Sequence, residues 1–188
     1  MRKLVATVFN YSLDGLLADE GTEFWKFCFD LLDLHGGPSK DEETLDFLQG
    51  AHAHIMGRVA YEGMSGALPG SDHPWAGILT AGRKVVFSRT LKAPEWANTT
   101  IAAGDTAEEI DKLRQGGDGH IVVWGGVTLW RSLMQLDLID EFQFTLFPYI
   151  AGEGTRLFDG VPKSYQLELV SNTASSQGVL DLRYRRPR

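Results

Sequence analysis

IVVWGGVTLW, residues 121–130, is a short apolar strand that runs into two adjacent glycines and then into a helical segment, Leu129–Leu136. The two glycines remove both Cβ atoms at a point where another group must approach the backbone closely. The helix beyond them offers free N–H groups and the positive end of its dipole to an anion, such as a cofactor pyrophosphate. A strand-Gly-Gly-helix turn also occurs as a plain tight connection, so this motif alone leaves both interpretations open.

The segments around this turn alternate between strand and helix patterns. Strands are predicted at residues 4–10, 52–56, 84–88, 99–103, 120–124, 142–149, 166–171 and 179–184. Helices are predicted from Ser39 or Asp41 to Ala51 and at residues 59–64, 106–115 and 129–136. Residues 23–34 fit either a helix or a packed excursion, and residues 65–77 fit a loop. This order predicts a single α/β domain over residues 1–188, a three-layer α/β/α sandwich whose central, mostly parallel mixed sheet ends in antiparallel C-terminal strands.

Composition narrows the classes of partner. The 188 residues carry a formal net charge of −7, which argues against nucleic-acid binding. No apolar run reaches the roughly 18–20 residues of a membrane span, and residues 1–10 lack a signal-peptide pattern. The single cysteine, Cys28, excludes an internal disulfide and fits a reducing compartment. We therefore expect a cytoplasmic protein that binds neither nucleic acid nor membrane. His52 and His54 alternate on one predicted strand without an evident third ligand, so we predict packed or solvated histidines and no metal.

Three predicted strands end in groups that suit a phosphate. Gly57-Arg58, Ser88-Arg89 and Gly125-Gly126 each follow a strand. Ligands of open α/β sheets bind outside the carboxyl ends of the strands, so these pairs are expected at one edge. Each arginine alone would more often be a surface charge, but two arginines beside a Gly-Gly turn favour a dinucleotide with an extra phosphate. The pattern therefore predicts NADPH rather than NADH, and it is not the G-x-G-x-x-G fingerprint.

Five motifs in a fixed order carry a family resemblance: Ser12–Ala18, Ile55–Glu62, Val86–Leu91, Trp124–Leu129 and Pro148–Phe158. Through them nearly the whole chain resembles the dihydrofolate-reductase-like fold. Within that fold it is most similar to the branch that contains the C-terminal reductase domain of the bacterial riboflavin-biosynthesis protein. Many bacterial proteins of that branch are single domains called dihydrofolate-reductase-like.

The resemblance implies an NADPH-dependent reductase and assigns a role to each motif. The adenosine end and its 2′-phosphate would be held by Gly57, Arg58, Ser88 and Arg89. The pyrophosphate would face Gly125 and Gly126, joined by a cis peptide, together with Val127, Thr128 and Leu129. Ala18 and the backbone near Asn10 would border the nicotinamide, and Val59 and Trp124 complete the cofactor-binding candidates. A homodimer through the C-terminal strands is also implied. One departure is Ala60, where relatives often carry a threonine.

The proton donor and the substrate contacts are less sharply indicated. Asp41 lies sixteen residues before Gly57, a spacing similar to that of the pterin-binding acid of dihydrofolate reductases. It is followed by Glu42 and Glu43, however, which equally fits a charged helix N-terminus. Trp25 fits either stacking on a planar substrate or core packing. Asp14 fits either a substrate contact or a turn residue that satisfies its own backbone.

These observations support one main hypothesis and two alternatives. The main hypothesis is transfer of a hydride from NADPH to a C=N or similar bond of a small planar heterocycle, such as a pterin or a pyrimidine. The first alternative is the reduction of 5-amino-6-(5-phosphoribosylamino)uracil in riboflavin biosynthesis, which needs basic groups for the sugar phosphate. Between residues 19 and 50 the only lysines or arginines are Lys26 and Lys40. The second alternative is a module that senses NADPH without catalysis.

Overall fold

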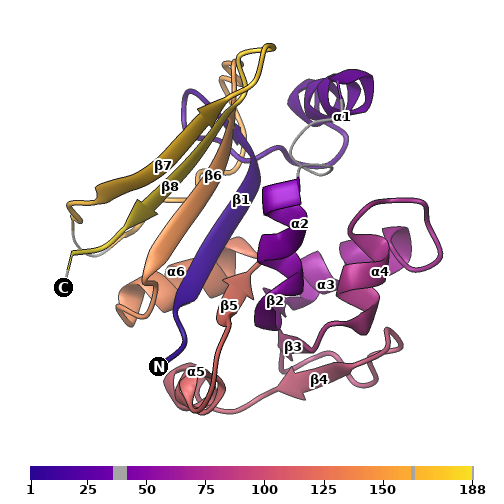
Figure 1. The fold of residues 1–188 in the computed structure, drawn as a ribbon, viewed down its shortest axis with the longest axis vertical. Helices are drawn as coiled ribbons and strands as arrows, with labels where there is room; N and C mark the ends of the chain where they lie inside the picture. Colours follow the sequence, from indigo (N-terminus) through magenta and orange to yellow (C-terminus); the bar gives the residue numbers. More distant parts are fainter. Residues whose placement is uncertain (36–41, 162–163, 188) are drawn as a thin grey trace.

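A computed structural model describes residues 1–35, 42–161 and 164–187. Within these residues eight strands form one sheet in the order β4-β3-β2-β5-β1-β6-β8-β7 (Figure 1). The strands are β1 (Leu4–Ser12), β2 (Ala51–Gly57), β3 (Lys84–Phe87), β4 (Thr99–Ala102), β5 (His120–Val123), β6 (Glu141–Phe147), β7 (Glu168–Ala174) and β8 (Leu180–Arg185). The pairings from β4 to β6 are parallel, and β8 runs antiparallel to both β6 and β7. The predicted mixed sheet is therefore confirmed.

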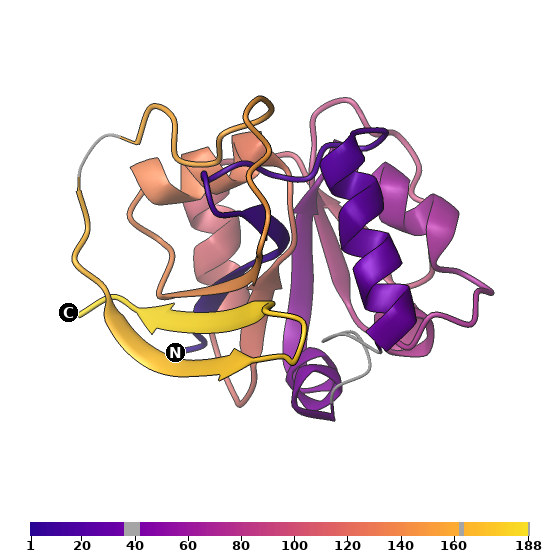
Figure 2. The ribbon, with the colours of Figure 1, turned by 90° about the horizontal axis from the view of Figure 1, so that it is seen from above.

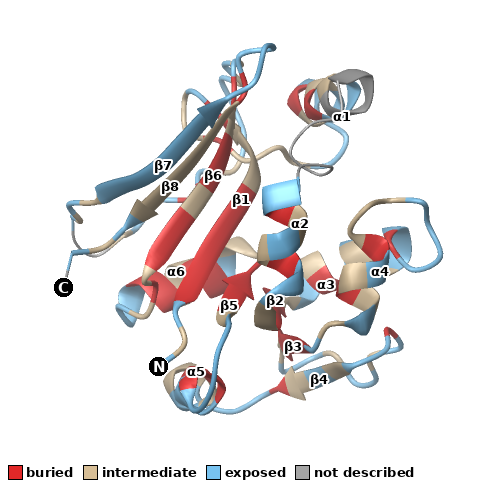
Figure 3. Cartoon of the chain, viewed as in Figure 1, coloured by how far each residue is buried: buried red, intermediate tan, exposed pale blue. Residues whose placement is uncertain are grey.

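Helices cover both faces of this sheet (Figures 1 and 2). Side chains of α5 (Thr106–Arg114) and α6 (Val127–Gln135) share one core cluster with Ile121 and Val123 of β5. On the other face, α2 (Glu42–Gln49), α3 (Arg58–Ala67) and α4 (Ala76–Ala81) pack with Val122. The central strands read as continuous apolar runs because both of their faces are buried (Figure 3). The three-layer α/β/α architecture is thus confirmed.

The structure decides one segment that the sequence left open and corrects another. Residues 23–34, for which a helix and a packed excursion were both open, form α1 (Glu23–His35), which packs through Phe24 and Cys28 against Phe147 at the end of β6. The loop expected at 65–77 is wrong at both ends, since α3 runs to Ala67 and α4 begins at Ala76. A six-residue helix has too few turns for a visible periodicity.

A buried lysine that follows α4 in the chain stabilises the C-terminal end of this helix. The Lys84 side chain is fully buried, and its ammonium group donates to carbonyl oxygens of Leu79, Thr80 and Gly82 at the C-terminal end of this helix. The cation thereby satisfies carbonyls that the helix cannot bond itself. Burial lowers the pKa of Lys84 to about 8.

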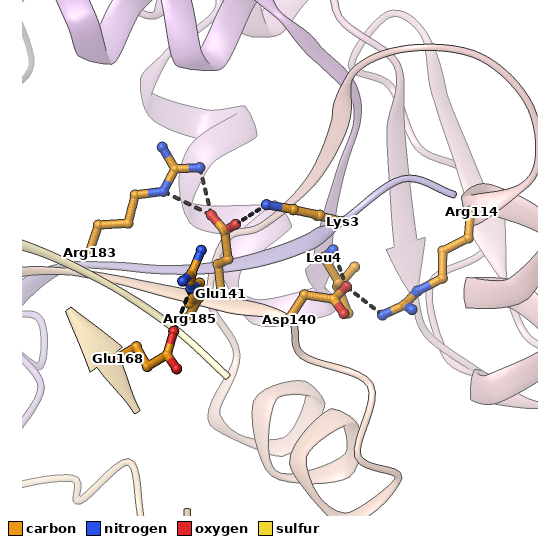
Figure 4. Close-up of polar contacts among 8 residues, drawn as sticks. All are labelled: Lys3, Leu4, Arg114, Asp140, Glu141, Glu168, Arg183 and Arg185. Atoms are coloured by element: carbon orange, nitrogen blue, oxygen red, sulfur yellow. Dashed lines mark hydrogen bonds and ion pairs between the residues drawn. The ribbon is translucent and has the colours of Figure 1, made fainter. Parts of the chain in front are cut away.

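The amino-terminal edge of the sheet is closed by ion pairs (Figure 4). The Asp140 carboxylate accepts hydrogen bonds from the Leu4 N–H and from the Arg114 guanidinium, both at 2.8 Å. The next residue, Glu141, accepts from Lys3 at 2.5 Å and from Arg183 at 2.6 Å. These contacts join the start of β1, the end of α5 and β8. They lie at the amino-terminal ends of the parallel strands, whereas the binding site is predicted at the carboxyl ends.

Candidate functional site

A cleft of about 370 Å³ lies at the carboxyl ends of β2, β3 and β4, beside the Gly-Gly turn that follows β5. It brings together eight of the predicted cofactor-binding residues: Gly57, Arg58, Val59, Ser88, Arg89, Gly126, Thr128 and Leu129. These residues come from three separate segments of the chain. They meet because parallel strands present their carboxyl ends at the same edge of the sheet.

Two glycines let the turns after β2 and β5 touch. The Gly57 N–H donates to the Gly125 carbonyl at 3.3 Å, and a Cβ on Gly126 would lie 3.4 Å from both the Cα and the N of Gly57. Gly126 has φ +94°, a conformation that L side chains rarely adopt. The expected cis peptide between Gly125 and Gly126 is wrong, because every described peptide bond is trans and the φ of Gly126 makes the turn instead.

This arrangement leaves the N-terminal ends of two helices available to a ligand. The N-cap residues of α3 and α6 are Gly57 and Gly126, and no side chain within the described residues caps either helix. By contrast, the Asp105 carboxylate caps α5 by accepting from the N–H groups of Ala107 and Glu108. Uncapped first-turn N–H groups, together with the helix dipole, favour an anion. The cleft therefore fits the pyrophosphate of a dinucleotide.

The two predicted arginines have different surroundings. Arg58 donates from Nη1 to both carboxylate oxygens of Glu62, at 2.9 and 2.8 Å. Arg89 is exposed, and across the described ranges no hydrogen bond or ion pair engages its guanidinium. Beside it, the Ser88 hydroxyl oxygen accepts from the N–H groups of Thr90 and Leu91. That turn directs the chain after β3 past the cleft.

Six residues of the lining were not predicted from the sequence: Phe87, Ala102, Ala103, Gly104, Thr106 and Ser132. Four of them, Ala102, Ala103, Gly104 and Thr106, lie between the last residue of β4 and the first residue of α5. The signal was present, because a strand was predicted at residues 99–103 and the rule for carboxyl ends applies to it equally. It was missed because this strand end carries no arginine and no paired glycines.

Five predicted cofactor residues lie outside the lining: Asn10, Ala18, Trp124, Gly125 and Val127. The Ala18 N–H donates to the Asn10 carbonyl at 3.2 Å, so these two residues are neighbours as expected. The Trp124 ring packs 5.3 Å from Phe9, and its indole N–H donates to Nδ1 of His54 at 3.0 Å. His54 is thus a packed histidine, and burial, assisted by the charge of Lys84, lowers its pKa to about 4.

Asp14 connects two loops at the carboxyl edge. Its carboxylate accepts from the Ser12 hydroxyl at 2.6 Å and from the N–H groups of Ala151 and Gly152 at 3.0 and 2.7 Å. These hydrogen bonds, that of Ser12 first, lower the pKa of Asp14 to about 2. The carboxylate therefore satisfies backbone groups of a distant loop, a role that neither sequence-based interpretation included.

The remaining substrate-side candidates are placed only in part. Trp25 is half-buried on α1, with its ring 4.6 Å from the ring of Phe29. Asp41 lies outside the described residues.

Among the helices of the described ranges, none is long and apolar enough to cross a membrane. In those same ranges no three His, Cys, Asp or Glu side chains gather in a set that could hold a metal ion.

Comparison with known proteins finds a similar sequence and similar folds. The Bacillus subtilis protein YyaP, itself uncharacterized, is 30% identical over 146 residues, which cover 74% of this chain and 76% of YyaP. A putative riboflavin biosynthesis protein from Shewanella sp. PV-4 superposes with a TM-score of 0.77 at 19% identity, covering 99% of both chains. Enterococcus faecalis dihydrofolate reductase, solved with NADP(H), superposes with a TM-score of 0.59 at 16% identity, covering 99% of this chain and 97% of that enzyme.

These two structures establish the fold as dihydrofolate-reductase-like, in agreement with the order of motifs along the sequence. The model of the RibD C-terminal domain family matches residues 3–180, nearly the entire chain. The chain therefore belongs to the RibD C-terminal domain family.

Proposed function

We propose that this protein is a cytoplasmic, NADPH-dependent reductase that transfers a hydride to a C=N or similar bond of a small planar heterocycle, such as a pterin or a pyrimidine. The observation that carries the proposal is the meeting of two uncapped helix N-termini, those of α3 and α6, between Arg58 and Arg89. Family membership and the likeness to a dihydrofolate reductase solved with NADP(H) support it.

In this proposal each part of the cleft binds one part of the cofactor. First-turn N–H groups of α3 and α6 donate to the pyrophosphate. Arg89, with Ser88 and Arg58, binds the 2′-phosphate, because a guanidinium matches phosphate geometry with two parallel hydrogen bonds. The backbone at Asn10 and Ala18 borders the nicotinamide, which supplies the hydride when the cofactor is bound. We assign the proton to Asp41, whose carboxyl group would donate it to the substrate nitrogen.

The charges beside the substrate side favour a heterocycle without a sugar phosphate. Between residues 19 and 50 the only lysines or arginines are Lys26 and Lys40, and the Lys26 ammonium group donates to Asp30 one turn further along α1. A phosphoribosyl substrate would need a cation that is not already paired. This observation places the aminouracil reductase alternative second. The other alternative is a sensor. A sensor would bind NADPH but would not oxidise it in the presence of any pterin or pyrimidine.

The test is a titration of the protein with NADPH and with NADH, followed by nicotinamide fluorescence. We expect tighter binding of NADPH, and we expect Arg89→Ala to remove most of that preference, because the charge-assisted contact to the 2′-phosphate is lost. Arg83→Ala is the matched control, since Arg83 is exposed at the opposite end of β3. The proposal fails if neither nucleotide binds at micromolar concentrations, or if Arg83→Ala changes the preference as much as Arg89→Ala does.

A further inference from the structure

Arg58 lines the proposed cofactor cleft and forms an ion pair with Glu62. Arg58 is the first residue of α3, and Glu62 follows one helical turn later. Their side chains remain 45% and 49% exposed, so both are open to solvent and to a ligand. Arg58 lines the cleft, whereas Glu62 does not line it and reaches it only through Arg58.

We propose that Glu62 determines how strongly the cleft discriminates between NADPH and NADH, by competing with the 2′-phosphate for Arg58. The inference rests on the proposed function, which puts the 2′-phosphate between Arg58 and Arg89. A bound 2′-phosphate must either displace the Glu62 carboxylate from the Arg58 guanidinium or bind close to this carboxylate, whose negative charge repels it. The 2′-hydroxyl of NADH carries no charge and can donate a hydrogen bond to a carboxylate.

The geometry makes Glu62 affect the two cofactors differently. Arg89 has no carboxylate partner in the described ranges, so it is available to either phosphate oxygen without competition. Arg58 has its charge compensated by Glu62 at 2.8 Å. Removing the carboxylate therefore adds an unopposed positive charge at the 2′ position, where only NADPH carries a phosphate. Glu62 therefore opposes the preference for NADPH that the two arginines create, and it limits how strongly the cleft discriminates.

The size of the effect follows from the exposure of the pair. Ion pairs in high dielectric are weak, so we expect Glu62→Gln to tighten NADPH binding about two- to fivefold. NADH binding is expected to stay unchanged or to weaken. Because exposed charges are screened, the gain should disappear at about 1 M salt, where the Debye length is about 3 Å.

The experiment measures the dissociation constants of NADPH and NADH by nicotinamide fluorescence for the full chain and for Glu62→Gln. Asp30→Asn is the matched control, because Asp30 forms a similar exposed ion pair with Lys26 one turn apart on α1. The same comparison in an Arg58→Gln background tests whether Glu62 acts through Arg58. Glu62→Gln should have no effect on nucleotide binding once Arg58 is absent. Glu62→Ala repeats the measurement should the glutamine form its own hydrogen bond to Arg58.

The outcomes separate this inference from the proposed function. A ratio of NADH to NADPH dissociation constants that rises in Glu62→Gln, and only when Arg58 is present, supports it. Equal shifts for both nucleotides, no shift, or an effect that persists without Arg58 would overturn it while leaving the reductase proposal intact. If the unaltered protein binds neither nucleotide, both proposals fail.

Discussion

Glu141 shows how a single buried carboxylate can stabilise one edge of the sheet. It is 3% exposed at the start of β6 and lies between Lys3 and Arg183 (Figure 4). Burial alone would raise its pKa, but the hydrogen bonds and charges of Lys3 and Arg183 outweigh it, and the pKa is lowered. The charged form is therefore the one that the folded state favours.

We expect Glu141→Gln to lower the free energy of unfolding by about 1.5–3 kcal/mol at pH 7, the range for hydrogen bonds to charged groups. A lowered pKa in the folded state means that this contribution is complete above the ordinary value of 4.5 and is lost as the pH falls through the lowered value. Urea unfolding of both proteins at several pH values checks this, and the difference between them should shrink below pH 4.5.

Glu168→Gln is the control for that prediction, because the Glu168–Arg185 pair is 48% and 60% exposed. Such a surface pair contributes at most about 1 kcal/mol. A difference between the Glu141 variant and the unaltered protein that stays constant from pH 7 to pH 3 would contradict the prediction. So would a loss of NADPH affinity, since Glu141 lies at the edge of the sheet opposite the cleft.

At the scale of elements, α6 depends on a glycine for the position of its N-terminus. Gly126 precedes the helix with φ +94° and ψ 95°, and it lies directly against Gly57 at the end of β2. A side chain here would be strained by the backbone conformation and would also approach the neighbouring turn. The glycine thus decides both the direction of the helix and the closeness of the two helix N-termini.

We expect Gly126→Ala to destabilise the protein by about 1–3 kcal/mol, the cost of holding a residue in a sparsely populated backbone region. It should also weaken NADPH binding, since relief of the strained φ would move the N-terminus of α6, which lies in contact with Gly57. Gly70→Ala is the matched control, because Gly70 has φ +76° but a Cβ there would meet no atom of the described residues within 4 Å. Urea unfolding and the nucleotide titration together test this. Equal losses of NADPH affinity in the two variants would show that the Gly57 contact is irrelevant.

At the scale of the whole molecule, the edge strand β7 exposes apolar side chains. Phe142, Phe144 and Phe147 of β6 are buried within the chain, so the aromatic residues of that strand do not form an interface themselves. All seven residues of β7, the outermost strand, are exposed (Figure 3). Leu169 of β7 is 53% exposed. An apolar groove of about 350 Å³, lined in part by Phe158 and Tyr184, lies on the same half of the sheet.

We propose that two copies of the chain associate through β7, because a long exposed edge strand with apolar side chains is normally covered. Light scattering on the purified protein should give the mass of a homodimer. Leu169→Lys is expected to shift it to the monomer by placing a charge in the interface. Thr100→Lys, on the opposite edge strand β4, is the control and should leave the dimer intact. A monomeric mass for the unaltered protein would refute the proposal.

Much of the fold and about half of the site follow from local patterns. Strands and helices alternate visibly along the chain because burial on both faces makes apolar runs and one-sided burial makes helical periodicity. Gly57-Arg58, Ser88-Arg89 and Gly125-Gly126 are recognisable because each combines a turn with phosphate-binding groups over two residues. The rule that parallel strands share a carboxyl edge then predicts that they meet, as the lining of the cleft confirms.

Only the tertiary structure decided the contacts between segments that lie far apart in the chain. Asp14 reaches Ala151 across 137 residues, and no local pattern reports that pairing. The Trp124 indole N–H donates to His54 across 70 residues, so the packing that lowers the pKa of this histidine is equally invisible to local patterns. Sequence by itself determined which segments form strands, helices and turns, since these depend on neighbours within a few residues. Partners, burial and pKa depend on which surfaces are brought together, and that is set by the packing of the whole chain.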